Sequence, residues 1–233
     1  MKIIVNSDAG GGDICSLKNK WNPQSLNWRS KYIDETYDSP CYIEIKDDDG
    51  DNMIDGIFSL PEEKAYMVLV RVHFGTKLVG NSDKVAYLKK LMNYFFYPAN
   101  LQYKTAAIYL DFIGSNISDK IAEEAGFFNG LSSDLIGLNN IPVALSPFFN
   151  TDKSIPDSVK EQDRNAIGKD FEVLKNRKKQ WLQYRKEKLL PDAERDLKDF
   201  ERKGNAIMID AKKMEIKHYQ AILEGMETAI NVK

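Results

Sequence analysis

The sequence predicts a mixed α/β (α+β) fold, in which a mostly antiparallel central sheet is flanked by helices and followed by a helical hairpin. Over residues 1–150, short β-branched and aromatic runs alternate with segments of helical periodicity. After Pro156 the pattern changes to charged sequence of helical period. The chain of 233 residues is long enough for one domain and an appendage. We therefore expect a domain of residues 1–150 and a charged helical extension of residues 151–233.

Charge and residue usage limit the classes of function. Residues 1–150 carry 14 Lys and Arg and 19 Asp and Glu, whereas residues 151–233 carry 19 and 16. Proteins that bind through phosphates usually have a much stronger basic excess, so nucleic acid is not an expected partner. The two cysteines and two histidines show no zinc-ligand spacing, and we expect no metal.

Membrane and export signals are not expected either. All apolar runs are shorter than the roughly 18 residues that span a bilayer. Residues 1–13 lack the apolar core of a signal peptide. The expected location is therefore the cytoplasm.

The first part of the domain is predicted to be mainly strands, because β-branched and aromatic runs lie between turn-forming clusters. The cluster at residues 48–51 is a turn that joins two strands into a hairpin. It is not a calcium loop, because with Gly50 at the sixth loop position Ile45 would stand where the first acidic ligand belongs. Two short helices broken by Pro23 come before this hairpin. The expected strands are residues 2–8, 41–47, 52–60 and 65–74.

The second part of the domain alternates helices and strands. A helix ends at Pro98, and its apolar face is formed by Leu88, Leu91, Met92, Phe95 and Phe96. The elements expected after it are a strand at residues 105–113, a short helix at residues 118–125 that is closed by Gly126, and one or two strands at residues 142–149.

The charged extension is predicted to be an antiparallel hairpin of two helices. The first helix covers residues 158–190, and the second begins at Pro191, which fits the first position of a helix, and continues to about residue 226. Residues at three-four spacing along the second helix predict a seam that packs against a neighbouring helix. These residues are Leu197, Phe200, Gly204, Ile207, Ala211, Met214, His218 and Ala221.

Two glycine-containing loops are candidates for phosphate binding. The glycines at residues 10–12 fit neither G-x-x-x-x-G-K-[ST] nor G-x-G-x-x-G and indicate a tight turn. Residues 77–82 (KLVGNS) follow the central strand and open a helix. Small residues at Gly80 and Ser82 would let a phosphate approach backbone N–H groups at the positive end of the helix dipole.

The order of elements over residues 1–150 resembles the GNAT family of acetyl-CoA-dependent N-acetyltransferases. In that family the loop after the fourth strand carries R/Q-x-x-G-x-G/A, of which Lys77-x-x-Gly80-x-Ser82 is a degenerate version. The run SNISDKIAEEAGF at residues 115–127 is similar to the family's N-x-x-S-x-x-(V/L)-A-E-K-x-G-F signature, especially as found in members resembling ribosomal-protein N-acetyltransferases. Ser118 matches the serine of this signature, and Asn116 lies one position from its asparagine.

The resemblance implies that acetyl-CoA is the co-substrate and that two central strands separate to admit its pantetheine arm. The implied cofactor-binding residues are Val70, Val72, Lys77, Val79, Gly80, Asn81, Ser82, Asn116 and Ser118.

A base must accept a proton from the acceptor amine. The candidates near the opening between the strands are Glu62 and Glu63 at the start of the central strand, His73 at its far end and Asp111 on the next strand. The tyrosine that many family members use as an acid has no counterpart, because its position falls on Ala122.

Three functions stay open at this point. The first is transfer of an acetyl group from acetyl-CoA to an amine of a protein or small molecule. The second is a non-catalytic GNAT-like domain that binds a protein partner or a second copy of the chain through residues 158–226. The third, binding of nucleic acid by the basic cluster at residues 175–179, is least favoured, because acids alternate with these bases as on a solvated helix face.

Overall fold

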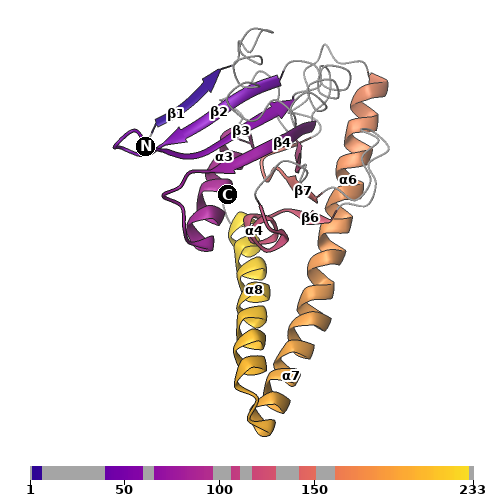
Figure 1. Ribbon diagram of the computed structural model, residues 1–233. Coiled ribbons are helices and arrows are strands. Elements are labelled where there is room, and N and C mark those ends of the chain that lie inside the picture. The colour runs from indigo at the N-terminus through magenta and orange to yellow at the C-terminus, as the bar shows by residue number, and fades with distance from the viewer. Residues whose placement is uncertain are drawn as a thin grey trace, which may run out of the picture.

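The computed structural model describes residues 2–6, 40–59, 66–96, 106–110, 117–129, 142–150 and 161–230. The described residues form a mixed sheet with helices packed on it, from which a long helical hairpin projects (Figure 1). The strand order across the sheet is β1-β2-β3-β4-β5-β7-β6. The predicted fold class is therefore confirmed.

The elements agree with most of those predicted from the sequence of the domain, although β6 was not expected. The strands are β1 (Lys2–Asn6), β2 (Pro40–Lys46), β3 (Asn52–Ser59), β4 (Tyr66–Phe74), β5 (Ala107–Leu110), β6 (Phe128–Asn129) and β7 (Pro142–Leu145). The helices are α3 (Asn81–Phe96), α4 (Asp119–Ala125), α6 (Glu161–Tyr184), the π-helical segment η2 (Arg185–Leu189), α7 (Leu190–Lys203) and α8 (Ala206–Ile230). The two short helices predicted around Pro23 lie outside the described residues.

The centre of the sheet contains a parallel pair of strands in antiparallel surroundings. Strands β1 to β4 pair antiparallel in sequence order, whereas β4 pairs parallel with β5, from Tyr66–Ala107 to Leu69–Leu110. Beyond this pairing β4 continues to Phe74. A β-bulge marks the same point, because Ile57 pairs with Arg71 and Phe58 with Leu69, which leaves Val70 as an extra residue on β4.

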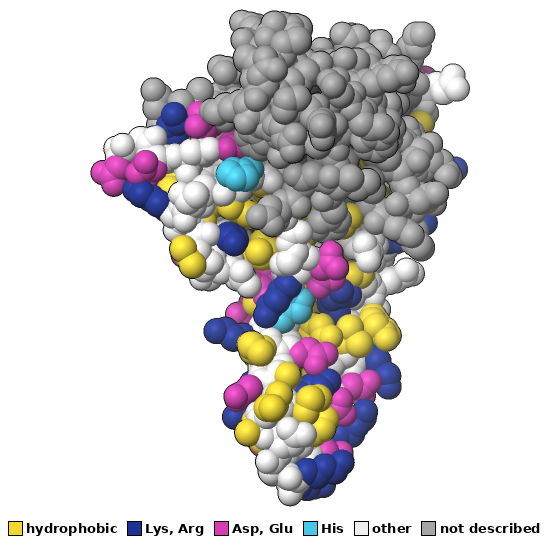
Figure 2. Space-filling model, in the orientation of Figure 1, with side chains coloured by type: hydrophobic (Ala, Val, Ile, Leu, Met, Phe, Trp, Pro, Cys, Tyr) yellow, Lys and Arg dark blue, Asp and Glu magenta, His cyan; other side chains and the backbone are white. Residues whose placement is uncertain are grey.

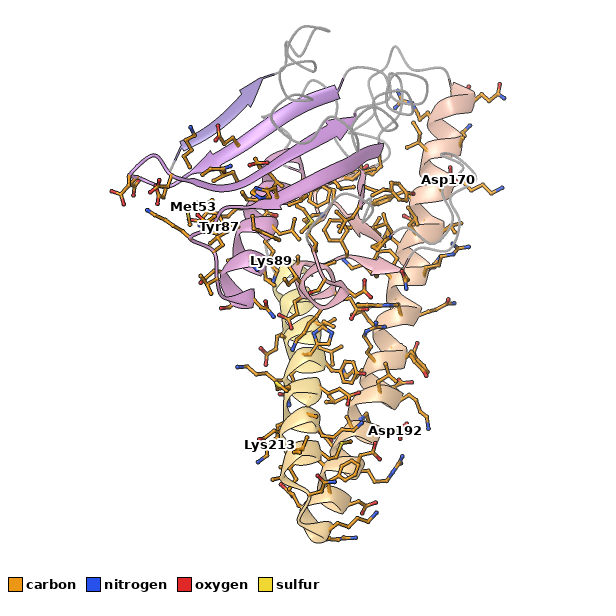
Figure 3. All side chains as sticks on the ribbon, viewed as in Figure 1. Met53, Tyr87, Lys89, Asp170, Asp192 and Lys213 are labelled. Carbon is orange, nitrogen blue, oxygen red and sulfur yellow. The ribbon has the colours of Figure 1, made fainter. Side chains whose placement is uncertain are left out.

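The core lies between this sheet and α3. The helix buries one face, as its periodicity predicted, and Leu88 and Leu91 are fully buried there. They belong to one apolar cluster with Ile54 and Val72 of the sheet. Each such side chain stabilises the fold by about 2 kcal/mol. Tyr87 of α3 packs against this cluster, which includes Met53 (Figure 3).

The helical extension packs on the domain through aromatic side chains. Phe171 of α6 is buried against Phe149, with 4.8 Å between ring centroids. Trp181 lies 6.2 Å from Phe128 of β6 by the same measure. Because β6 and β7 pair with each other, α6 covers the edge of the sheet that these strands form.

The predicted position of the hairpin turn is wrong. The first arm does not end before Pro191 but runs through it, and the turn lies at Gly204, which has φ +67°. Pro191 is accommodated because a π-helical segment precedes it, in which the N–H of Leu190 donates to the carbonyl of Arg185. Gly204 then ends α7 in the left-handed conformation, and the side chain of Asn205 accepts the N–H of Met208 to start α8.

The predicted seam on the second helix is wrong in its middle, whereas Leu197, Phe200, His218 and Ala221 towards its two ends are half-buried. Ile207 and Met214 are 81% and 59% exposed, and Ala211 is exposed between them. Among the α8 residues whose side chains the structure describes, the most buried is instead Ile222. The three-four spacing was extended across Gly204, where one helix stops and another starts in a new phase.

Candidate functional site

The loop between β4 and α3 is held tightly against β3. The N–H of Gly75 donates to the carbonyl of Met53 at 2.8 Å, and a Cβ at this position would lie 1.8 Å from the carbonyl oxygen of Asn52. Only glycine fits this approach. The loop turns at once, since the N–H of Leu78 donates to the carbonyl of Gly75, and Leu78 is buried beneath it.

This loop brings the N-terminus of α3 to the end of β4. The carbonyl of Gly80 accepts the N–H of Lys84 at 3.2 Å, which is the first turn of the helix. Val79 is 83% exposed, and Asn81 and Ser82 are exposed as well. The first turn of a 16-residue helix therefore faces outward at the end of the central strand, where its dipole favours an anion.

Lys77 interacts with the acidic turn between β2 and β3. Its ammonium group forms ion pairs with Asp51, with Asp47 at 3.2 Å and with Asp49 at 3.8 Å. Hydrogen bonds to Asp51 and Asp47 raise the pKa of Lys77 above its ordinary value. Lys77 thus connects this loop to the β2–β3 turn, and the resemblance-based role in pyrophosphate binding stays a prediction.

Some of the other predicted cofactor and base residues are described by the structure, and some are not. Val72 is fully buried in the core, so only its backbone could reach a cofactor, and Val70 is the bulged residue of β4. Asn116, Glu62, Glu63 and Asp111 lie outside the described residues, and their roles stay predictions. His73 is the one predicted base that the described residues include.

Helix α4 shows what the signature-like run does locally. The hydroxyl of Ser118 caps the helix by accepting the N–H of Ile121 at 3.4 Å. Gly126, with φ +111°, ends it, and the N–H of Phe127 donates to the carbonyl of Ala122. The serine and the glycine of the run are therefore caps of a helix that buries Ile121 and Ala122.

Three strands place polar side chains in a row on the sheet. Glu44 of β2 pairs directly with Asp55 of β3, and Asp55 pairs with His73 of β4. The face is the one opposite α3, because Ile54 and Phe74, which alternate with the row, lie in the core. Asp55 was not predicted, although its register opposite His73 follows from the strand pattern.

The carboxylate of Asp55 is buried and only partly satisfied. One oxygen, Oδ2, accepts from the amide of Asn52 and lies 3.7 Å from Nδ1 of His73. The other, Oδ1, is buried without a hydrogen-bond partner. Burial of the group raises the pKa of Asp55 to about 6, and the nearby Glu44 carboxylate adds to the rise.

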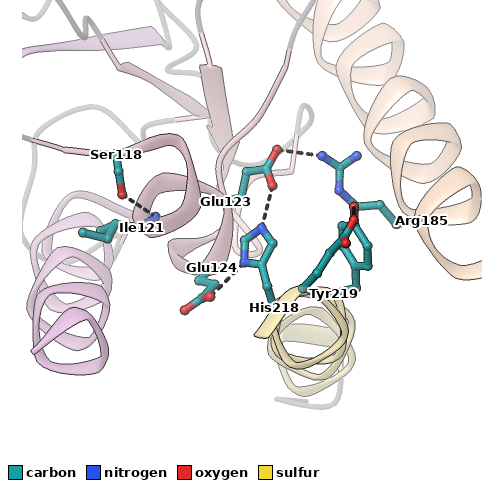
Figure 4. A network of polar contacts seen from close by, with 8 residues as sticks. Ser118, Ile121, Glu123, Glu124, Arg185, His218 and Tyr219 are labelled. Carbon is teal, nitrogen blue, oxygen red and sulfur yellow. Dashed lines mark hydrogen bonds and ion pairs between the residues drawn. The ribbon is translucent and has the colours of Figure 1, made fainter. Parts of the chain in front are cut away.

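A second polar cluster joins α4 to the helical extension (Figure 4). Nδ1 of His218 lies 2.8 Å from Glu124 and Nε2 lies 3.0 Å from Glu123. Glu123 also accepts from Arg185 at 2.6 Å, and the Arg185 guanidinium stacks on Trp181 at 3.4 Å from the ring centroid. Since both ring nitrogens face carboxylates, the protonated imidazole fits this arrangement. We call Glu123, Glu124, Arg185 and His218 the clamp.

The charges of the clamp support one another. Burial lowers the pKa of His218, but the hydrogen bonds and charges of Glu123 and Glu124 outweigh it, and the net shift is upward from 6.5. Burial raises the pKa of Glu123, but His218 and Arg185 outweigh it, and the net shift is downward from 4.5. No local sequence pattern predicts this cluster, because the residues that each of its contacts joins are 62 to 95 positions apart.

An open hollow of about 250 Å³ lies next to the clamp, lined in part by Glu123, Asp119 and Asn129.

Within the described residues, no group of three or more His, Cys, Asp and Glu side chains could hold a metal ion. Nor does any described helix combine the length and the apolar character that crossing a membrane requires.

Comparisons with known proteins give weak matches. No protein-family model matches the sequence, and no curated protein does. Among the solved structures it matches are three variants of the spermidine N-acetyltransferase SpeG from Vibrio cholerae. One is a point mutant (13% identity, TM-score 0.35), and two are chimeras with hSSAT (12% and 14% identity, TM-scores 0.36 and 0.35). The matches cover 63% of this chain and 95%, 96% and 97% of theirs. At TM-scores this low, the likeness carries no argument about function.

The clamp makes stability depend on pH. Because the folded pKa of His218 is raised, its contribution is complete below about pH 6.5 and is lost as pH rises through the folded pKa. The lowered pKa of Glu123 means that its contribution is lost only in acid, as pH falls below about 4.5. We therefore expect the free energy of unfolding, measured with urea from about pH 6 to about pH 9, to fall with rising pH.

Variants test the origin of this dependence. His218→Gln should flatten the pH profile, and Glu123→Gln should lower the free energy of unfolding by about 2 kcal/mol at neutral pH. Glu172→Gln is the matched control, because Glu172 is in an exposed ion pair with Lys175 and should change stability by less than about 0.5 kcal/mol. A wild-type profile that His218→Gln leaves unchanged would contradict the clamp.

Proposed function

We propose that this protein is a GNAT-type N-acetyltransferase that moves an acetyl group from acetyl-CoA to an amine of a protein or small molecule. The proposal rests on the sequence resemblance over residues 1–150 and on the arrangement of the central strands. Its particular likeness to ribosomal-protein N-acetyltransferases, carried by residues 115–127, would favour a protein amine as acceptor.

One observation carries the proposal. The only parallel pairing among the described strands joins β4 to β5 as far as Leu69–Leu110, where the described part of β5 ends, and β4 continues to Phe74 before the chain turns at Gly75 straight into the N-terminus of α3. A bulge at Val70 interrupts the ladder at the same point. The resemblance implies that the pantetheine arm binds where these strands separate and that the pyrophosphate binds at the helix start after the fourth strand. Residues 79–82 occupy that helix start.

Titration calorimetry with acetyl-CoA and CoA tests the proposal. We expect micromolar binding that Gly80→Glu abolishes, because a side chain here starts 3.2 Å from the Asp83 carboxylate and adds a second negative charge at the helix start. Asp83→Asn should instead tighten binding by about 2- to 5-fold, since it removes a charge that repels the pyrophosphate.

Ala206→Glu is the matched control, because it puts the same charge at the start of α8 and should leave binding unchanged. Circular dichroism verifies that each variant is folded. Absence of binding at millimolar acetyl-CoA would rule out the acetyltransferase.

A second candidate function is an assembly or binding module that uses the helical extension. The observation that favours it is the exposed apolar stripe on α8, where Ile207, Ala211 and Met214 follow one another at helical spacing. Figure 2 shows hydrophobic side chains between charged ones along the projecting hairpin. Such a stripe suits the close approach of another helix, from a second copy or a partner.

Light scattering after gel filtration tests self-assembly through this stripe. If two copies associate by it, wild-type protein is dimeric and the double variant Ile207→Glu, Met214→Glu is monomeric, because buried carboxylates oppose association. Val173→Glu, at an exposed apolar residue of α6, is the control and should stay dimeric. A wild-type monomer at high concentration would contradict assembly with a second copy.

A further inference from the structure

The row of Glu44, Asp55 and His73 has a property that packing does not explain. Asp55 is 2% exposed, yet one of its oxygens has no hydrogen-bond partner, and its direct cross-strand neighbour on β2 is another carboxylate. An unsatisfied buried acceptor costs about 1 to 3 kcal/mol, and like charges placed opposite one another on a sheet are destabilising. Such a cost is typical of functional sites.

The charges in the row leave Asp55 dependent on His73. Lys46 lies 3.4 Å from Glu44 and balances it. Asn52 donates to Asp55 and fixes the orientation of its carboxylate but brings no charge. Among the described residues, the basic group that faces Asp55 is therefore the imidazole of His73, whose Nδ1 lies 3.7 Å from Oδ2 of Asp55.

His73 can reach solvent, whereas Asp55 cannot. The His73 side chain is 50% exposed and that of Asp55 is 3% exposed. A half-exposed imidazole whose Nδ1 faces a buried carboxylate is the arrangement that makes histidine an effective proton acceptor, because the anion stabilises the imidazolium and fixes the ring. His73 also lies three residues beyond the bulge at Val70, about 10 Å along β4.

We propose that His73 is the proton acceptor for the acceptor amine and that Asp55 is the positioning residue that orients its ring and stabilises its charged form. This inference rests on the proposed acetyltransferase function. An ammonium substrate gives one N–H proton to Nε2 of His73. The freed nitrogen lone pair forms the C–N bond with the thioester carbonyl carbon, and the C–S bond breaks with its electron pair on sulfur. The CoA thiolate takes a second proton from the acylated nitrogen, and His73 releases its proton to solvent.

Carbon-detected NMR of the Asp55 carboxyl group tests the coupling without any substrate. We expect it to titrate near pH 6, the pKa to which burial raises this group. His73→Gln should raise the pKa of Asp55, because the charge and hydrogen bond of His73 lower this pKa. Glu44→Gln should lower the pKa of Asp55, because the Glu44 charge raises it. An Asp55 titration that does not respond to His73→Gln would overturn the inference.

The rate of CoA release from acetyl-CoA tests the catalytic role, with a lysine-containing peptide and 1,4-diaminobutane as amine probes. His73→Gln should lower kcat by about 100-fold with the KM for acetyl-CoA unchanged, as for loss of a general base. Asp55→Asn should lower kcat and remove the pH dependence of the rate around pH 6, which a purely structural role would not do. Unchanged kcat in both variants overturns the inference alone, whereas a wild-type protein that binds no acetyl-CoA overturns the proposed function with it.

Discussion

The parallel pairing of β4 with β5 is the constraint on which the rest of the structure depends. Antiparallel strands can be joined by a tight turn, as β2 and β3 are, but a parallel neighbour requires the chain to cross over the sheet and return. Helix α3 is part of this crossover, so its N-terminus necessarily stands at the carboxyl end of β4. The same crossover places the apolar face of α3 against the sheet and closes the core. One topological requirement thus produces both the core and the candidate anion site.

The helical extension is joined to the domain by two kinds of contact. Aromatic side chains of α6 cover the β6–β7 edge, and the clamp connects α4 with η2 and α8. The clamp uses Glu123 and Glu124, which lie in the middle of the signature-like run. In this chain that run therefore has a second role, since its inner face packs in the domain while its acidic residues hold the extension. The charge pattern of the extension, balanced over its length, fits a surface that is largely solvated.

Much of the domain could be predicted because its signals are local. Alternation identified β2 and β3, an apolar run after a turn identified β4, a 3.6-residue period identified α3, and Ser118 and Gly126 mark the two ends of α4. The hairpin turn was misplaced because Pro191 is a strong helix-start signal, whereas its accommodation by a π-helical segment depends on the surrounding helix. The pair of Gly204 and Asn205 did carry the correct signal, a left-handed cap followed by a helix N-cap. The clamp could not be found by spacing, because tertiary packing brings its members together. In the row, the register of Asp55 opposite His73 follows from the strand pattern, but the burial of Asp55 does not.

The central claim is that the end of β4 and the first turn of α3 form the binding site for acetyl-CoA. Hydrogen exchange of the backbone amides, measured with and without saturating acetyl-CoA, tests this claim by location and not only by affinity. The account predicts slower exchange at residues 70–74 and 79–83, with little change in α7 or the tip of the hairpin. Protection confined to the helical extension, or protection nowhere, would contradict it.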